Sequence, residues 1–232
     1  TCMPMYEYMD IPGIDHLGRQ LADLPTQMQL TSVAHQLGKK DILSETFALC
    51  GWNVSFEELR WIYESQMVHG ITWLCQHLQG YSLRGIRKRD YPASLFRHQP
   101  WWKEYRVFND MVSRIGYLLS NGEIDHKILV LHNVSSGWCE YSFTASGKQK
   151  ATHYSDQMLD TMQKLEWAQL QYHLGDDRLM GKYGVAPVHT LQEIELLHNL
   201  FPQNILLFRV TDNNNSTLGG VVIYIVNRVA HA

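Results

Sequence analysis

Glu45 lies in a segment whose residue types suit chemistry on a sugar. A strand-like run, residues 40–43, leads into it, and Phe47 and Trp52 follow within the next few positions. In a barrel of alternating strands and helices, catalytic groups lie at the carboxyl ends of the strands. A carboxylate at such a strand end, with aromatic residues around it, indicates cleavage of a glycosidic bond. That reaction normally needs two carboxylic acids, so Glu45 would require a partner.

The chemistry expected of Glu45 is that of a general base. Its carboxylate would take a proton from the water that attacks the anomeric carbon, which requires a fixed strand-end position with room for that water. The alternative is a surface glutamate, or one at a helix start, with no catalytic part. The residues by themselves leave these two interpretations open.

Two more carboxylates precede Glu45 in the chain. Glu7 and Asp10 are expected near the end of a first strand, within residues 2–10, where they would reach the same pocket. There they would hydrogen-bond sugar hydroxyls, contact a metal ion or orient Glu45. The alternatives are a buried, paired carboxylate for Glu7 and an Asx-type turn before Pro12 for Asp10.

The remaining candidates are histidine and aromatic residues expected in strand-end loops. His77 follows a later strand on the same side and would donate to a sugar hydroxyl, although a lone histidine is more often structural. Trp52 and Tyr81 would stack on the C–H faces of a sugar, although most aromatic residues of the chain are expected in the core. Asp15 and His16 are expected in the loop after the first strand, where they either bind a hydroxyl or stabilise the loop.

The composition indicates a globular protein and excludes several classes of function. The chain has 232 residues, 45% of them hydrophobic and 19% charged, and its net charge of −3 leaves no broad basic face for nucleic acid. No apolar run approaches the roughly 20 residues that cross a bilayer, and no signal peptide is recognisable. The four cysteines are widely spaced without a Cys-x-x-Cys pair, so neither a zinc site nor a disulfide framework is expected.

The elements that would position Glu45 alternate between strand and helix. Ser55 and Glu58 have the spacing of a capping box, and apolar residues at helical spacing then predict a helix over residues 56–69. A strand, a helix and a strand within about thirty residues are typical of a right-handed βα unit. Further elements are expected along the chain: a strand over residues 71–75, an irregular loop over 78–100 and a helix over 101–120.

The composition changes near residues 120–126, and we place a domain boundary there. We expect a first domain over residues 1–122 and a second, smaller α/β layer domain over residues 123–232. The chain begins with Thr1 rather than with an initiator methionine, so a piece of a longer protein is expected. The elements predicted for the second domain are strands over 126–131, 204–210 and 221–226 and helices over 154–174 and 190–201.

Several spaced blocks resemble large bacterial α-L-rhamnosidases, in the order in which those enzymes have them. Residues 3–19 resemble their sixth barrel strand and the following loop, blocks within residues 32–52 the seventh strand, and blocks within residues 70–82 the eighth. Little is recognisable beyond Lys182. Pro100-Trp101-Trp102 and Arg114 also resemble the closing helix of that barrel. Residues 131–138 and, faintly, residues 174–177 resemble the α/β domain that follows the barrel.

The resemblance implies a fold and an activity. The fold class is α/β, with the last third of a (β/α)8 TIM-type barrel followed by part of a smaller α/β layer domain. The family hydrolyses terminal α-L-rhamnosides with inversion and uses calcium near the sugar, without an organic cofactor. Glu45 matches the carboxylate after the seventh strand, the general base, whereas the acid after the fourth strand has no counterpart in this chain. The partner implied is a rhamnose-containing glycan in the periplasm or outside a bacterial cell.

Two alternatives stay open. In a retaining barrel enzyme of the β-galactosidase kind, Glu45 would be the nucleophile, with its partner carboxylate about 5–5.5 Å away rather than about 6.5–9.5 Å. Alternatively, the chain is a non-catalytic carbohydrate-binding fragment, because three strands cannot close a barrel. On that ground the 232-residue chain by itself is expected to be inactive.

Overall fold

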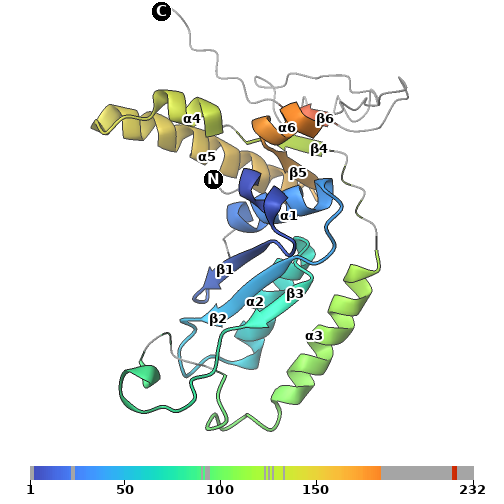
Figure 1. Cartoon of the computed structure of the whole chain (residues 1–232), viewed down its shortest axis with the longest axis vertical. Helices are drawn as coiled ribbons and strands as arrows, with labels where there is room; N and C mark the ends of the chain where they lie inside the picture. The colour runs from blue at the N-terminus through green and yellow to red at the C-terminus, as the bar shows by residue number, and fades with distance from the viewer. Residues whose placement is uncertain are drawn as a thin grey trace, which may run out of the picture. The chain divides into compact units, whose positions relative to one another are not determined.

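The computed structural model describes residues 3–21, 24–89, 91, 95–122, 124, 126, 128–132, 134–183 and 221–223 (Figure 1). The chain divides into two compact units, Cys2–Ile124 and Asp125–Ala232, close to the boundary predicted after residue 122. Among the described residues, each unit has one three-stranded sheet and every strand pair is parallel, so the predicted α/β class is confirmed. None of the helices in the described ranges is long and apolar enough to span a membrane.

The first unit is a βαβαβ arrangement whose strands lie in chain order. The strands are β1 (Gly13–Leu17), β2 (Leu43–Ala48) and β3 (Trp73–Gln76), and β2 pairs with both of the others. α1 (Leu24–Gln36) connects β1 to β2, and α2 (Phe56–Val68) connects β2 to β3. Because such crossovers are right-handed and both advance in the same direction across the sheet, both helices cover the same face.

α2 forms where the local sequence predicts it. The Ser55 hydroxyl accepts a hydrogen bond from the backbone N–H of Glu58, and the Glu58 carboxylate accepts one from the Ser55 N–H. The apolar face of the helix buries Leu59 and Ile62. Capping and hydrophobic periodicity therefore agree, and the helix predicted over residues 56–69 is confirmed.

The face of the sheet that α2 covers includes polar residues from β2. Ser44 and Thr46 are buried and hydrogen-bonded to each other at 2.7 Å, and Thr46 also lies 3.2 Å from the side-chain amide of Gln66 in α2. Buried polar groups need such partners, so this pairing fixes which side of β2 faces the helix. Because side chains alternate along a strand, Leu43 and Glu45 face the opposite side.

The first segment of the chain is not the predicted strand. Residues Met3–Tyr8 form a 3-10 helix, η1. Pro4 explains the difference, because proline has no N–H to donate to a strand ladder and its fixed φ suits a helical turn. The first strand is instead β1, which includes Asp15 and His16, two residues predicted in a loop.

β2 also lies further along the chain than predicted. It starts at Leu43, three residues after the predicted start at residue 40, and ends at Ala48, so Glu45 lies inside the strand rather than at its end. The preceding residues stay outside the strand ladder. The backbone N–H of Ile42 donates to the hydroxyl of Thr72 at 3.0 Å instead of to a backbone carbonyl of a neighbouring strand.

The stretch after β3 is irregular, as predicted, apart from a short 3-10 helix, η2 (Gly85–Lys88). α3 (Tyr105–Ser120) follows, and residues 101–104 form turns instead of the predicted first helical turn. Aromatic packing joins α3 to α2, since the rings of Phe108 and Phe56 stack with centroids 6.1 Å apart. The predicted helix is therefore confirmed except at its start.

The second unit has its strands in the order β5-β4-β6. A strand is confirmed within each of the predicted ranges 126–131 and 221–226, although His126 lies outside the first of these strands. The helix predicted over 190–201 and the strand predicted over 204–210 lie outside the described residues. The elements are β4 (Ile128–Leu131), α4 (Val134–Glu140), α5 (Ala145–Trp167), β5 (Tyr172–Gly175), α6 (Asp177–Tyr183) and β6 (Val221–Ile223).

The helix predicted over residues 154–174 is wrong at both ends. α5 begins nine residues earlier, because the Thr144 hydroxyl accepts a hydrogen bond from the Gly147 N–H at 3.2 Å and caps it. Residues 145–148, which are mostly small and polar, are therefore its first helical turn. The helix ends before Gln169, whose φ of 56° is a left-handed conformation that stops a helix. The chain then forms β5.

Candidate active site

Three side chains from the three strands of the first sheet lie in one row. Asp15 of β1, Glu45 of β2 and Cys75 of β3 occupy equivalent positions in the parallel register. Residues paired in this way point to the same side of a sheet, and the buried Ser44 and Thr46 show that the other side faces α2. Glu45 and Cys75 are half-buried, and Asp15 is exposed. We call the side of the first sheet that bears Asp15, Glu45 and Cys75 the open face.

The backbone immediately after Glu45 is strained. Phe47 and Leu49 have φ values of 81° and 59°, in the left-handed region that residues with side chains seldom occupy. The register between β1 and β2 shifts at the same place, between His16 and Leu17. Strain of this kind persists where the surrounding packing enforces it, and it is concentrated at functional sites.

Phe47 supplies that packing. Its side chain is 1% exposed, and its ring meets Phe108 of α3 edge to face, with centroids 6.1 Å apart. The end of β2 is thereby anchored to α3. The anchor limits the movement of Glu45, two residues earlier in the same strand.

His77 lies beside this strand end, as predicted from its place after β3. Its backbone N–H donates to the carbonyl of Thr46 at 2.8 Å, and alternation along β3 directs its ring to the side of Cys75. The ring stacks on Tyr91 with centroids 5.9 Å apart. Among the described residues its Nδ1 is buried without a hydrogen-bond partner. The structure therefore brings His77 and Glu45 to the open face.

Arg19, just after β1, connects the loops at the same end of the sheet. Its guanidinium donates to the Cys50 carbonyl at 2.6 Å, to the Asn53 side chain at 2.5 Å and to the Glu58 carboxylate at 2.6 Å. The sequence holds no local signal for this network, because the partners lie more than thirty residues away. Burial raises the pKa of the Cys50 thiol to about 11, so this thiol stays protonated at neutral pH and is a poor nucleophile.

The two predicted aromatic platforms lie in loops that follow the strands. Trp52 follows β2, and its side chain is 37% exposed, with the indole N–H 3.4 Å from the carbonyl of Lys88. Gln99 donates to the Trp52 carbonyl at 2.9 Å and so holds the loop. Tyr81 follows β3 and is fully exposed. Both rings therefore have free faces, but the structure does not bring either into contact with Glu45.

Glu7 and Asp10 do not lie where the sequence predicts them. Glu7 is in η1, and Asp10 follows η1 and is exposed. Both precede Gly13, the first residue of β1, whereas the strained turn and His77 lie after the carboxyl ends of their strands. The prediction that they end a first strand is wrong, because η1 replaces that strand.

The described residues give no support for a metal site. Within those ranges, no group of three or more histidine, cysteine, aspartate and glutamate side chains is placed to hold a metal ion. The calcium ion expected from the resemblance stays a prediction.

Comparisons with known proteins yield one distant likeness. No family model matches the chain, and no curated protein matches it. The chain is similar to the structure of a rhamnosidase from Novosphingobium sp. PP1Y, with 19% identity, a TM-score of 0.47 and coverage of 56% of this chain. It spans 14% of the length of that structure. A likeness of this extent does not assign the chain to a family or establish an activity.

Proposed function

We propose that the first unit is part of the catalytic barrel of a glycoside hydrolase of the inverting α-L-rhamnosidase kind, with Glu45 as its general base. The supporting observation is the position of Glu45, half-buried on the open face of a parallel sheet and two residues before a strained, anchored strand end. In a barrel, the side of the sheet opposite the helices is the interior, and the strand ends carry the chemistry.

The proposed role follows from the chemistry of the carboxylate. Glu45 accepts a proton from water while the water oxygen attacks the anomeric carbon, and a second carboxylic acid donates a proton to the leaving oxygen. Inversion requires about 6.5–9.5 Å between the two carboxyl groups so that water fits between them. Asp15 is on the adjacent strand, and adjacent strands lie only about 4.8 Å apart. The acid therefore comes from another strand of the proposed barrel, and Asp15 orients the water or the sugar.

The neighbouring side chains fit an uncharged sugar as substrate. His77 has a ring nitrogen that can hydrogen-bond a hydroxyl at the open face, and Trp52 and Tyr81 have exposed rings that can stack on the C–H face of a pyranose. From the resemblance we propose a terminal α-L-rhamnoside of a glycan as this sugar, with calcium near it.

The test compares Glu45→Gln with the matched variant Glu57→Gln in the complete gene product. Glu57 is exposed in the first turn of α2, and its change leaves the open face intact. Loss of a general base lowers the rate about 100-fold or more. We expect such a fall in the hydrolysis of 4-nitrophenyl α-L-rhamnopyranoside for Glu45→Gln and at most about a twofold change for Glu57→Gln. Near-normal hydrolysis by Glu45→Gln would show that the assignment is wrong.

One observation favours a retaining enzyme as the second candidate. Asp15 and Glu45 are paired in register on neighbouring strands, and that spacing is closer to the roughly 5–5.5 Å of retaining enzymes than to the inverting distance. In that case Glu45 is the nucleophile and Asp15 the acid and base. NMR detection of the first-formed sugar anomer separates the candidates, because inversion of an α-rhamnoside releases the β-anomer.

A further inference from the structure

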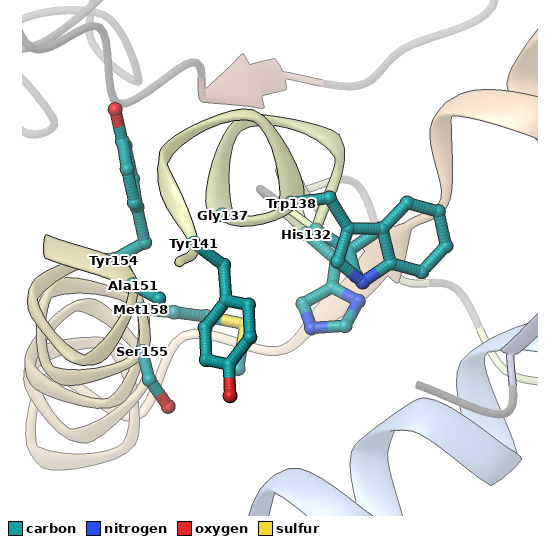
Figure 2. Close-up of a pocket in the computed structure, with 9 residues that line it drawn as sticks. His132, Gly137, Trp138, Tyr141, Ala151, Tyr154, Ser155 and Met158 are labelled. Atoms are coloured by element: carbon teal, nitrogen blue, oxygen red, sulfur yellow. The ribbon is translucent and has the colours of Figure 1, made fainter. Parts of the chain in front are cut away.

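A pocket in the second unit offers a different chemistry from the open face. It lies between α4 and α5 next to the end of β4, and its volume is about 190 Å³ (Figure 2). The residues that decide its chemistry are His132, Trp138, Tyr141, Tyr154, Ser155 and Met158. All of them belong to the second unit, so the pocket is independent of the first sheet.

The pocket lies beside the carboxyl end of β4, the side of a parallel sheet on which ligands bind. The chain passes from β4 to its neighbour β5, whereas β6 pairs on the other side of β4. Sheets with such a reversal bind ligands outside the carboxyl ends of the strands at the reversal. His132 is the first residue after β4, and its backbone N–H donates to the Gly175 carbonyl at 2.8 Å. This hydrogen bond holds His132 at the carboxyl end of the sheet.

The lining of the pocket selects an uncharged ligand. Among the described residues, the lining includes no acidic side chain, lysine or arginine. Burial lowers the pKa of His132, so its ring is neutral at physiological pH and offers one donor and one acceptor nitrogen. A charged ligand would lose its hydration without gaining a partner here.

The same lining combines aromatic surface with a few hydroxyl groups. Trp138 and Tyr141 supply rings, and Figure 2 shows the hydroxyls of Tyr141 and Ser155 pointing to the same side, whereas that of Tyr154 points away. Among the described residues, no hydrogen bond occupies the hydroxyl of Tyr141 or Ser155, and the His132 ring, whose Nδ1 is buried, also lines the pocket. Rings for an apolar face and free polar groups at its edge suit a pyranose.

The size of the pocket limits the ligand to one ring. Its volume of about 190 Å³ is below the roughly 300 Å³ at which pockets for drug-sized ligands begin. We propose that the second unit binds a single uncharged pyranose between α4 and α5, stacked on Trp138 and hydrogen-bonded by His132, Tyr141 and Ser155. The described residues that line the pocket include no carboxylate, so the proposed role is binding without cleavage. This proposal goes beyond the proposed function, because it concerns the other unit.

The test uses saturation-transfer NMR on the 232-residue chain with three probes and one competitor. The probes are methyl α-L-rhamnopyranoside, methyl α-D-mannopyranoside and methyl β-D-galactopyranoside, and phenol is the competitor. Trp138→Ala removes the proposed platform, whereas Trp167→Ala is the matched control, because Trp138 and Trp167 are 61% and 80% exposed and only Trp138 lines the pocket. Tyr141→Phe keeps its ring and loses only a hydroxyl.

We expect at least one pyranoside to bind the wild type. Trp138→Ala should raise its Kd about tenfold and Tyr141→Phe about threefold, whereas Trp167→Ala should leave it within about twofold. Glu45→Gln should also leave the Kd of the pyranoside unchanged. A failure of the proposed catalytic role of Glu45 is therefore distinguishable from a failure of this site. The proposal is overturned if no pyranoside binds, if only phenol binds, or if Trp138→Ala and Trp167→Ala have equal effects.

Discussion

Within the part of the chain that the structure describes, the two sheets contain the same number of parallel strands but differ in strand order. In the first sheet the strands follow chain order, so the right-handed crossovers place α1 and α2 on one face and leave Asp15 and Glu45 on the other. In the second sheet the order β5-β4-β6 reverses at β4, and the pocket lies at a strand end between two helices. The two candidate sites therefore differ in position, one on a sheet face and the other beside the end of a strand.

The chemistry of the two regions differs in the same way. The open face presents carboxylates beside a strained backbone, which suits the transfer of protons. The pocket between α4 and α5 presents rings, hydroxyls and a neutral histidine, which suits binding alone. We therefore expect changes in the first unit to alter catalysis and changes in the second to alter affinity.

The largest expected effect on stability is at Phe47, which anchors the strained end of β2. Phe47→Ala removes a fully buried ring and its contact with Phe108, so the free energy of unfolding of the first unit should fall by about 3–5 kcal/mol. Urea unfolding followed by hydrogen-exchange mass spectrometry reports on each unit separately. Equal destabilisation of the second unit would contradict the division into two units.

Substitution of one glycine in each unit should change the stability of the two units in opposite directions. Gly70, before β3, has a φ of 101°, and a Cβ there would lie 2.6 Å from the ring of His35, so Gly70→Ala should destabilise the first unit by about 1–3 kcal/mol. Gly181 in α6 has open space around its Cα, so Gly181→Ala should stabilise that helix by about 0.5–1 kcal/mol. Thermal unfolding of both variants checks the opposite signs. A stabilising Gly70→Ala would refute the contact with His35.

The helix caps of the two units should differ less. Ser55→Ala removes the hydroxyl that accepts from the Glu58 N–H, but the backbone N–H of residue 55 still donates to the Glu58 carboxylate. Thr144→Ala removes the hydroxyl that accepts from the Gly147 N–H and caps α5. Each change should cost about 1 kcal/mol, because each leaves one backbone N–H of the first helical turn without its acceptor. Urea titration of both variants measures each loss. A loss well below about 0.5 kcal/mol for either variant would contradict the role of its hydroxyl as a helix cap.

The smallest expected effect is a pH dependence of the first unit. The hydrogen bond from the Ser55 backbone, with a smaller contribution from Arg19, lowers the pKa of the Glu58 carboxyl. The folded state therefore binds fewer protons at Glu58 than the unfolded state, so this stabilisation is complete above the ordinary pKa and is lost as the pH falls through the lowered value. The free energy of unfolding, measured from neutral to acidic pH, should fall less steeply with decreasing pH for Glu58→Gln than for the wild type. An equal fall in the two proteins would mean that Glu58 makes no such contribution.

The sequence predicted those elements whose signals are local. α2 has a capping box and an apolar face within one segment, and its bounds were predicted to within one residue. β1 was missed because only Ile14 and His16 of its residues are buried, which leaves too short an alternation to recognise. The start of α5 was missed because Thr144 caps a turn of small polar residues that also suits a loop.

The candidate site was predicted in part, for a related reason. Glu45 belongs to a recognisable strand and His77 follows another, so their position toward the carboxyl ends of the strands could be inferred from chain order. The row that Asp15 forms with Glu45 depends on the register between strands that lie thirty residues apart in the sequence. Register is determined by packing across the sheet, and no local pattern encodes it.

Azide rescue tests the role of Glu45 most directly. Glu45→Ala in the complete gene product opens space where the attacking water would be activated, and azide is a nucleophile that needs no base. With 4-nitrophenyl α-L-rhamnopyranoside, we predict that azide raises the rate of this variant at least about tenfold and yields β-L-rhamnosyl azide. No rescue, or a product with the α-configuration, would contradict the assignment of Glu45 to the attacking side of the sugar.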